Sequence, residues 1–214
     1  MLLPPLPPPV WPSPAHRYAL IFALIGLCTG IELVLLAADW GLIGTPRWRA
    51  LGLQYGAFWS GLLRDWQPNY GTQPWLMFCT YAFLHVGPMH LIGNMMAVIW
   101  LGPPLLDQLG RRGFCVLWAT GAAGGAFCFA ALSTAPAPMV GASGAVFGLV
   151  GAIVALDYLR RGDLQAVFGM TAAITALNGL MFVLENGALA WETHLGGYLA
   201  GILVTAALRP AKPS

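Results

Sequence analysis

Long apolar runs separated by short polar connections make up most of this sequence. The chain has 214 residues, of which 58% are hydrophobic and only 8% are charged, whereas soluble domains carry about 25% charged residues. A run of about 20 apolar residues can cross a bilayer as a helix. We therefore expect an all-α, polytopic membrane protein whose six helices, at 18–38, 75–101, 114–132, 143–159, 164–184 and 191–208, form one compact bundle.

The two ends and one long connection fall outside these runs. Seven prolines among the first fourteen residues predict an extended Pro-rich tail over 1–16, and a short C-terminal tail follows at 210–214, so one domain is expected over 17–209. The connection at 39–74 is too long for a simple turn and should lie partly in the outer interface as short helices, since amphipathic aromatic rings favour the headgroup region. Five tryptophans lie in it or at its end: Trp40, Trp48, Trp59, Trp66 and Trp75.

The orientation follows from the basic residues of the connections, because cytoplasmic loops carry an excess of Lys and Arg. These residues divide into seven on one side (Arg17, Arg111, Arg112, Arg160, Arg161, Arg209 and Lys212) and three on the other (Arg47, Arg49 and Arg64). We predict that both termini are cytoplasmic and that the connections at 39–74, 133–142 and 185–191 face outward. The tail does not resemble an organelle transit peptide, which favours a bacterial plasma membrane.

Several functional classes are disfavoured by the sequence. The net charge of +2 is small and scattered, so there is no basic patch for nucleic-acid binding. His85 and His90 are five residues apart with no carboxylate between them, unlike the HExxH metal motif, and we assign His85 to the substrate-facing or structural end of the second helix. Four cysteines without CxxC spacing are expected to be free, buried thiols: Cys28, Cys79, Cys115 and Cys128.

Four polar side chains fall together in the outer half of the membrane in this arrangement. His90 and Asn94 share one face of the second helix because of their i, i+4 spacing, while Ser143 and His194 lie in the first turns of the fourth and sixth helices. Polar groups inside a bilayer mark a functional site by default. Each residue alone also has a structural interpretation, as a helix-packing, capping, interfacial or interhelical hydrogen-bonding group, but their convergence favours a common site.

Glycine spacing indicates how closely the helices of this site approach. Gly144 and Gly148 form a GxxxG pair on the fourth helix, and Gly197 and Gly201 form another on the sixth. Small residues at this spacing let helices pack closely, as a serine–histidine hydrogen bond would need, although the pattern alone indicates only packing. Phe147 lies one turn after the serine and either packs on the histidine ring or is an ordinary core or lipid-facing aromatic residue.

These residue types suit nucleophilic catalysis. A serine hydroxyl attacks efficiently only when a base removes its proton, and His194 can do this and then protonate the leaving amine. The oxyanion needs preorganised donors, which the Ser143 N–H at a helix N-terminus, the Asn94 amide and the His90 imidazole can supply. Glu192 is two residues from the histidine and should point elsewhere, so a Ser–His dyad is expected.

Three motifs resemble the rhomboid intramembrane serine protease family: GASG at 141–144, HLIGN at 90–94 and HLGGYLAG at 194–201. The stretch 74–102 is also similar, and the resemblance covers about 75–208. It implies a six-helix bundle around a wet cavity, a dyad of Ser143 and His194, oxyanion support from His90 and Asn94, and no metal or cofactor. Gly141 belongs to the same GASG motif and is expected to pack the site. Members of the family cut transmembrane segments of single-span proteins near helix-destabilising, small residues.

Two positions depart from the family pattern. Leu76 follows the loop tryptophan where the family often has arginine, and Leu106 and Asp107 occupy a region that often carries glutamate. Both departures concern local stability or membrane anchoring rather than the chemistry.

The sequence therefore predicts an intramembrane serine endopeptidase with transmembrane proteins as substrates and the lipid bilayer as its surroundings. The fifth helix and the cap at 185–191 are expected to gate lateral substrate entry. A non-catalytic protein that binds transmembrane helices is the alternative. A small-solute transporter would need inverted repeats and polar groups at mid-membrane, and neither is found. The sequence names neither the substrate nor an oligomeric state.

Overall fold

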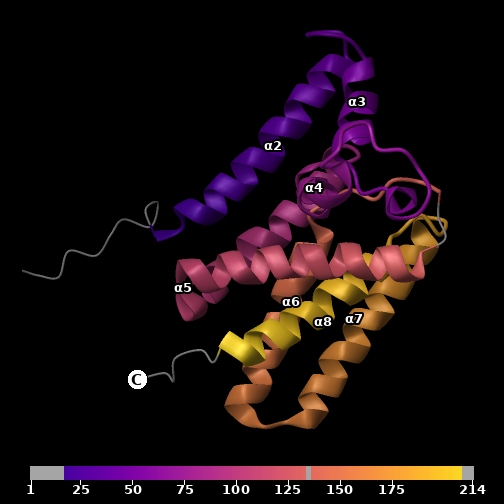
Figure 1. The fold of residues 1–214 in the computed structure, drawn as a ribbon. Helices are drawn as coiled ribbons and strands as arrows, with labels where there is room; N and C mark the ends of the chain where they lie inside the picture. Colours follow the sequence, from indigo (N-terminus) through magenta and orange to yellow (C-terminus); the bar gives the residue numbers. More distant parts are fainter. Residues whose placement is uncertain (1–16, 134–135, 209–214) are drawn as a thin grey trace, which may run out of the picture.

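The computed structural model describes residues 17–133 and 136–208, so the predicted tails at 1–16 and 210–214 lie outside the described residues. Within them the protein is all-helical apart from one isolated bridge between Phe58 and Met139, which confirms the predicted fold class (Figure 1). The helices in chain order are α2 (Ala19–Asp39), α3 (Arg47–Gly56), η1 (Ser60–Leu63), α4 (Gln73–Thr80), η2 (Tyr81–Phe83), α5 (Pro88–Leu132), α6 (Ser143–Arg161), α7 (Leu164–Leu184) and α8 (Trp191–Leu208).

Among the described residues, four helices are long and apolar enough to cross a membrane: α2, α5, α6 and α7. α5 has 45 residues and is interrupted at Gly110, whose φ of 68° and ψ of 174° are not helical. Glycine adopts this backbone conformation without the steric cost that a Cβ brings. Figure 1 shows the chain reversing its direction there, so α5 consists of a first arm (88–109) and a second arm (111–132). With the two arms counted separately and α8 added, six helical segments form the bundle.

The predicted start of the second helix is wrong. The sequence pattern placed it at residue 75, whereas α4 and η2 occupy 73–83 and the first arm begins at Pro88. Proline is favoured at the first position of a helix, where its missing N–H leaves no bond unmade. The apolar run continues across this boundary, so hydropathy alone could not locate it. The predicted bounds of the fifth and sixth helices agree with α7 and α8.

The second arm of α5, α6 and α8 form the centre of the bundle and meet along glycine residues. A Cβ placed on Gly197 would lie 2.0 Å from the carbonyl oxygen of Gly144, and one on Gly201 would lie 2.0 Å from that of Gly148. The GxxxG pairs of α6 and α8 therefore face each other in backbone contact. The contact extends to α5, because a Cβ on Gly196 would lie 2.2 Å from the carbonyl oxygen of Gly124. We call the whole contact the glycine seam.

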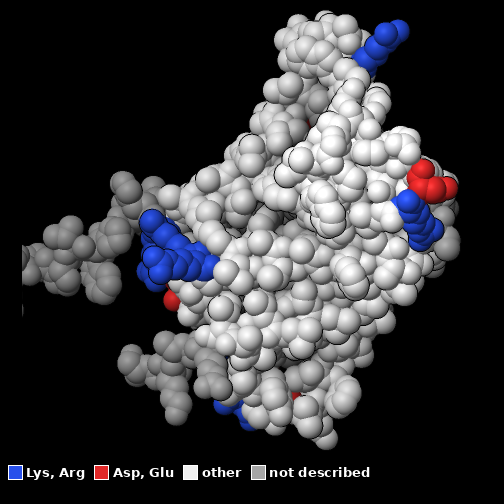
Figure 2. Space-filling view, viewed as in Figure 1, with Lys and Arg blue, Asp and Glu red and all other residues white. Residues whose placement is uncertain are grey.

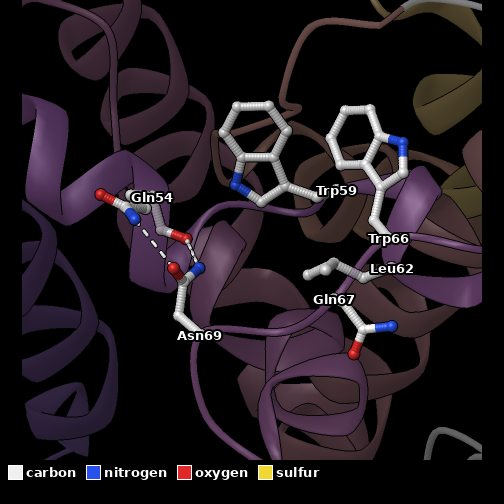
Figure 3. A pocket seen from close by; sticks show the side chains of 6 residues that line it. All are labelled: Gln54, Trp59, Leu62, Trp66, Gln67 and Asn69. Atoms are coloured by element: carbon white, nitrogen blue, oxygen red, sulfur yellow. Dashed lines mark hydrogen bonds between the residues drawn. The ribbon is translucent and has the colours of Figure 1, made fainter.

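The connection at 39–74 contains the short helices α3 and η1, as predicted. Trp40 and Trp75 are 72% and 77% exposed, which suits rings at a membrane interface. Trp59 and Trp66 line a pocket of about 180 Å³ in this connection (Figure 3). Gln54 and Asn69, which are hydrogen-bonded to each other, lie on its other side, and no residue of the predicted catalytic site lines it. The pocket is therefore a feature of the connection at 39–74.

A buried ion pair joins this connection to α2. Glu32 is fully buried in α2 and accepts bonds on both carboxylate oxygens from the Arg49 guanidinium, at 3.0 and 3.1 Å. Arg49 also donates to Asp39 at 2.6 Å and to the carbonyl oxygen of His85 at 3.1 Å. One guanidinium thus ties α2 and α3 to the segment that leads into α5. In the sequence, Arg49 indicated only the side of the membrane on which this connection is expected to lie.

At the opposite end of α2, an acidic residue takes part in helix anchoring. Asp107 of the first arm pairs with Arg17 at 2.9 Å and accepts from the Tyr18 hydroxyl at 3.1 Å, while Leu106 is 5% exposed and packs in the core. At this departure from the family pattern, Leu106 therefore lies in the core and the Asp107 carboxylate lies beside the start of α2.

The surface is that of an integral membrane protein. Figure 2 shows a broad uncharged area across the molecule, with basic side chains beside the turn of α5, at the lower end and over the connection at 39–74.

All four cysteines are free, but Cys79 and Cys115 are exposed and Cys128 is partly exposed, so only Cys28 fits the predicted burial. A cysteine flanked by apolar residues in the sequence need not be buried, because the surface of a membrane protein is itself apolar. α7 has no buried residue.

Candidate catalytic site

The site is built around the start of α6. Gly141, two residues before Ser143, has a φ of 119°, and its N–H donates to the carbonyl oxygen of Tyr81 at 3.0 Å. A Cβ on Gly141 would lie 2.6 Å from Cε1 and 2.7 Å from Nε2 of His90. Both the backbone conformation and the close approach of the imidazole therefore require glycine at 141, and they place the histidine of the first arm against the loop that leads into Ser143.

Tyr81 holds the loop that leads into Ser143. Its buried hydroxyl donates to the carbonyl oxygen of Ala122 in the second arm at 2.7 Å, and a Cβ on Gly144 would lie 2.5 Å from the same hydroxyl. Burial raises the pKa of Tyr81, so the phenol stays protonated and can donate. η2, which the sequence analysis merged into the second helix, thus positions the first turn of α6.

Tyr81→Phe is expected to lower the free energy of unfolding by about 1 kcal/mol, the typical net contribution of one hydrogen bond. Thermal unfolding in detergent measures this, with Tyr158→Phe as the matched control because Tyr158 is exposed. Equal stability of both variants and the wild type would show that the hydroxyl contributes nothing to the loop.

His194 is fixed by contacts from two other helices. Its ring stacks on Phe147 of α6, with centroids 4.1 Å apart and an angle of 6° between the planes. Its Nδ1 is hydrogen-bonded to Oδ1 of Asn178 on α7 at 2.5 Å. The side chain is buried, with 9% of its surface exposed. Of the two positions left open for Phe147, the structure shows the one on the histidine ring.

Ser143 is the first residue of α6, one turn before Phe147, and is partly exposed. Within the described part of the chain, no hydrogen bond joins Ser143 to His194. Catalytic hydrogen bonds are often long or misaligned without substrate and tighten when substrate binds. What the structure brings together is the first turn of α6 and the first turn of α8, through the stacked rings and the glycine seam.

His90 and Asn94 lie one turn apart on the first arm. The Asn94 amide donates one hydrogen to the carbonyl oxygen of His90 at 3.0 Å, which leaves its second N–H unused by that bond. His85 lies just before α5 rather than within it and is fully buried, with its ring edge-on to His90 at 5.2 Å. Burial, followed by the neighbouring His90, lowers the pKa of His85 to about 4, so this imidazole is neutral at physiological pH.

The donor set does not suggest a metal site. No group of three or more His, Cys, Asp or Glu side chains with metal-binding proximity occurs among residues 17–133 and 136–208. Glu192 is buried in the first turn of α8, and no contact links its carboxylate to His194 in this part of the chain.

Sequence reasoning missed two residues of this site, Asn178 and Tyr81. Asn178 is an amide within an otherwise apolar helix, and the cost of a polar group in a bilayer was a signal that could have drawn attention to it. Tyr81 carried no such signal, because its role depends on a boundary that hydropathy does not reveal.

Comparison with known proteins places this chain in a family. The sequence model of the Rhomboid domain matches residues 72–211, which include α4 to α8 and every residue of the predicted site. Rhomboid protease GluP of Bacillus subtilis (strain 168) is 31% identical over 137 residues, which cover 63% of this chain and 26% of that protein. RHOMBOID-like protein 1 of Arabidopsis thaliana is 29% identical over 136 residues, which cover 61% of this chain and 33% of that protein.

Putative rhomboid protease YdcA of Bacillus subtilis (strain 168) is 28% identical over 148 residues, which cover 69% of this chain and 74% of that protein. The chain spans only a quarter to a third of the length of the first two relatives. The match nevertheless covers well over half of this chain, from α4 to α8, so the protein belongs to the rhomboid family of polytopic membrane proteins.

Proposed function

We propose that this protein is an intramembrane serine endopeptidase that hydrolyses peptide bonds in or beside the transmembrane segments of single-span proteins. The observation that carries the proposal is the contact of His194 with Phe147, one turn after Ser143. This contact supports the pairing of the candidate base of α8 with the candidate nucleophile of α6. Membership in the rhomboid family supports a protease-type function.

In the proposed reaction, Nε2 of His194 takes the proton of the Ser143 hydroxyl while Oγ forms a bond to the scissile carbonyl carbon. The resulting tetrahedral intermediate collapses when the C–N bond breaks and the imidazolium returns its proton to the leaving amine. Water, deprotonated by the same imidazole, then attacks the acyl-enzyme and releases the carboxylate product and the free serine.

Three donors around the start of α6 are assigned to the oxyanion. The Ser143 N–H lies at a helix N-terminus, where backbone N–H groups are unpaired. The second N–H of the Asn94 amide and the His90 imidazole, which lies against Gly141, are the others. Each such donor contributes about 3–4 kcal/mol to stabilising a transition state.

The surrounding chain suits a substrate that enters from the lipid phase. α7 has no buried residue and is joined to the bundle by few contacts, so we assign to it and to the cap at 185–191 the lateral gate. The basic residues support cytoplasmic termini and an active site that opens to the outer face of a bacterial plasma membrane. The domain is assigned to 17–209, between the two tails.

The test uses protein reconstituted in liposomes with a panel of single-span substrates, and cleavage is read by mass spectrometry. In parallel, a fluorophosphonate probe reports labelling of Ser143 in detergent. Wild type should cleave near the outer face and be labelled, Ser143→Ala should do neither, and the matched control Ser60→Ala in the outer connection should behave as wild type.

If wild type neither cleaves nor is labelled, the catalytic proposal fails. The alternative is then a non-catalytic protein that binds transmembrane helices, and it predicts that Ser143→Ala still retains such helices.

A further inference from the structure

Two polar contacts hold α7 against α8 in the described part of the chain. The Thr171 and Tyr198 hydroxyls share a hydrogen bond at 2.6 Å, and Oδ1 of Asn178 is hydrogen-bonded to Nδ1 of His194 at 2.5 Å. Since α7 consists mostly of apolar side chains and none of its residues is buried, an amide in such a helix requires a specific partner. The partner of Asn178 is the candidate catalytic base.

The direction of this hydrogen bond follows from the second contact of the amide. Nδ2 of Asn178 donates to the carbonyl oxygen of Ile174, one turn earlier, at 3.0 Å. A carbonyl can only accept, so this bond requires the amide nitrogen on that side and leaves Oδ1 facing His194. Because Oδ1 is also only an acceptor, Nδ1 of the histidine must carry a hydrogen.

In a neutral imidazole with its hydrogen on Nδ1, the lone pair lies on Nε2. The Phe147 ring packs against the face of the same imidazole at 4.1 Å. The amide therefore determines the tautomer and the rotation of the ring within its plane, while the phenyl ring determines the plane.

We propose that Asn178 is a positioning residue that holds His194 in the tautomer whose Nε2 accepts the proton of Ser143. This inference rests on the proposed function and replaces the predicted dyad by a serine–histidine–asparagine arrangement with an uncharged third member. Because the acceptor lies on α7 whereas nucleophile and base lie on α6 and α8, the base is oriented only while α7 is docked.

The electrostatic surroundings make this arrangement testable by pH. On α5, His90 is the titratable group that interacts electrostatically with His194, and from α6 the uncharged Phe147 ring packs on the imidazole. On α8 itself, the Glu192 carboxylate is two residues from His194 and interacts electrostatically with Cys128. Beyond the end of α7, the Glu185 carboxylate interacts electrostatically with His90. A carboxylate at position 178 would be the only acidic group in direct contact with the imidazole in the described chain.

The test measures the rate of Ser143 labelling by the fluorophosphonate probe as a function of pH, because a small probe does not require substrate entry past α7. Wild type, Asn178→Asp, Asn178→Leu and the matched control Thr171→Val are compared in detergent. Thr171→Val removes the other α7–α8 hydrogen bond without touching the histidine.

Asn178→Asp should move the acidic limb of the rate profile to higher pH, because a carboxylate stabilises the protonated imidazole. Asn178→Leu should lower the plateau rate roughly 10- to 100-fold, a part of the 10²–10⁴ that general-base catalysis provides, whereas Thr171→Val should keep the wild-type profile. The proposal is overturned if Asn178→Leu reacts at the wild-type rate. It is also overturned if Asn178→Leu and Thr171→Val slow equally while the limb of Asn178→Asp stays in place.

Failure of the proposed function gives a different result, since wild type itself would then not be labelled at Ser143. If Asn178→Asp does not fold, as judged by thermal unfolding, the comparison of Asn178→Leu with Thr171→Val decides the question.

Discussion

Gly197→Val should disrupt the centre of the bundle and abolish labelling of Ser143. A Cβ at this position would lie 2.0 Å from the carbonyl oxygen, 2.9 Å from the carbonyl carbon and 3.1 Å from the Cα of Gly144. All three are backbone atoms of α6, so no side-chain rotation can relieve the clash and the two helices must separate. Overpacking typically costs 1–3 kcal/mol and occasionally more, and we expect about 3 kcal/mol or more here, measured by unfolding in detergent.

The matched control is Gly169→Val on α7. A Cβ there meets nothing within 4 Å, and replacing a helical glycine slightly favours the helix, so stability should change by less than about 0.5 kcal/mol. Similar stability of Gly197→Val and Gly169→Val would contradict the backbone contact between α6 and α8.

Arg49→Met is expected to be the most destabilising change in the connection at 39–74. It would leave the fully buried Glu32 carboxylate without its bidentate partner and the carbonyl oxygen of His85 without its donor. Removing one member of a buried ion pair costs about 3–5 kcal/mol. The measurement is the free energy of unfolding in detergent, with Arg47→Met on the same helix as the control for a lost surface charge.

The double variant Arg49→Met with Glu32→Met separates pairing from charge burial. Replacing both partners of a buried pair by apolar residues is often neutral or stabilising, so the double variant should recover most of the loss. If Arg49→Met is no less stable than Arg47→Met, the ion pair does not hold the connection at 39–74 in place.

The sequence predicted the elements whose signal is local. Hydropathy located α2, α6, α7 and α8 because each apolar run ends at polar residues or glycine, and the spacing of Gly144, Gly148, Gly197 and Gly201 indicated which faces approach. It failed where the apolar run continues past the end of a helix, as between α4 and α5. Side-chain partners across the bundle, such as the pairing of Asn178 with His194, depend on how the helices dock, which no local pattern encodes.

Candidate site residues divide in the same way. The four polar side chains were predicted to form a site because each is costly in a bilayer, and in the structure His90 lies against Gly141 and His194 stacks on Phe147. Arg49 was assigned to the outer side by counting charges, but its burial against Glu32 depends on α3 folding back onto α2. The exposure of the cysteines was mispredicted because an apolar stretch of sequence can face either the protein core or the lipid.

The glycine seam also has an entropic consequence. Ordering a long side chain on folding costs up to about 2 kcal/mol, whereas glycine and alanine lose no rotamers. The second arm of α5, α6 and α8 therefore associate through atoms that have almost no conformational freedom to lose, in a medium where water release contributes little to helix association. Since α7 has no buried residue and α2 packs on the bundle through side chains such as Ile21, heating should release these two helices first, while the three central helices remain together until the whole bundle unfolds.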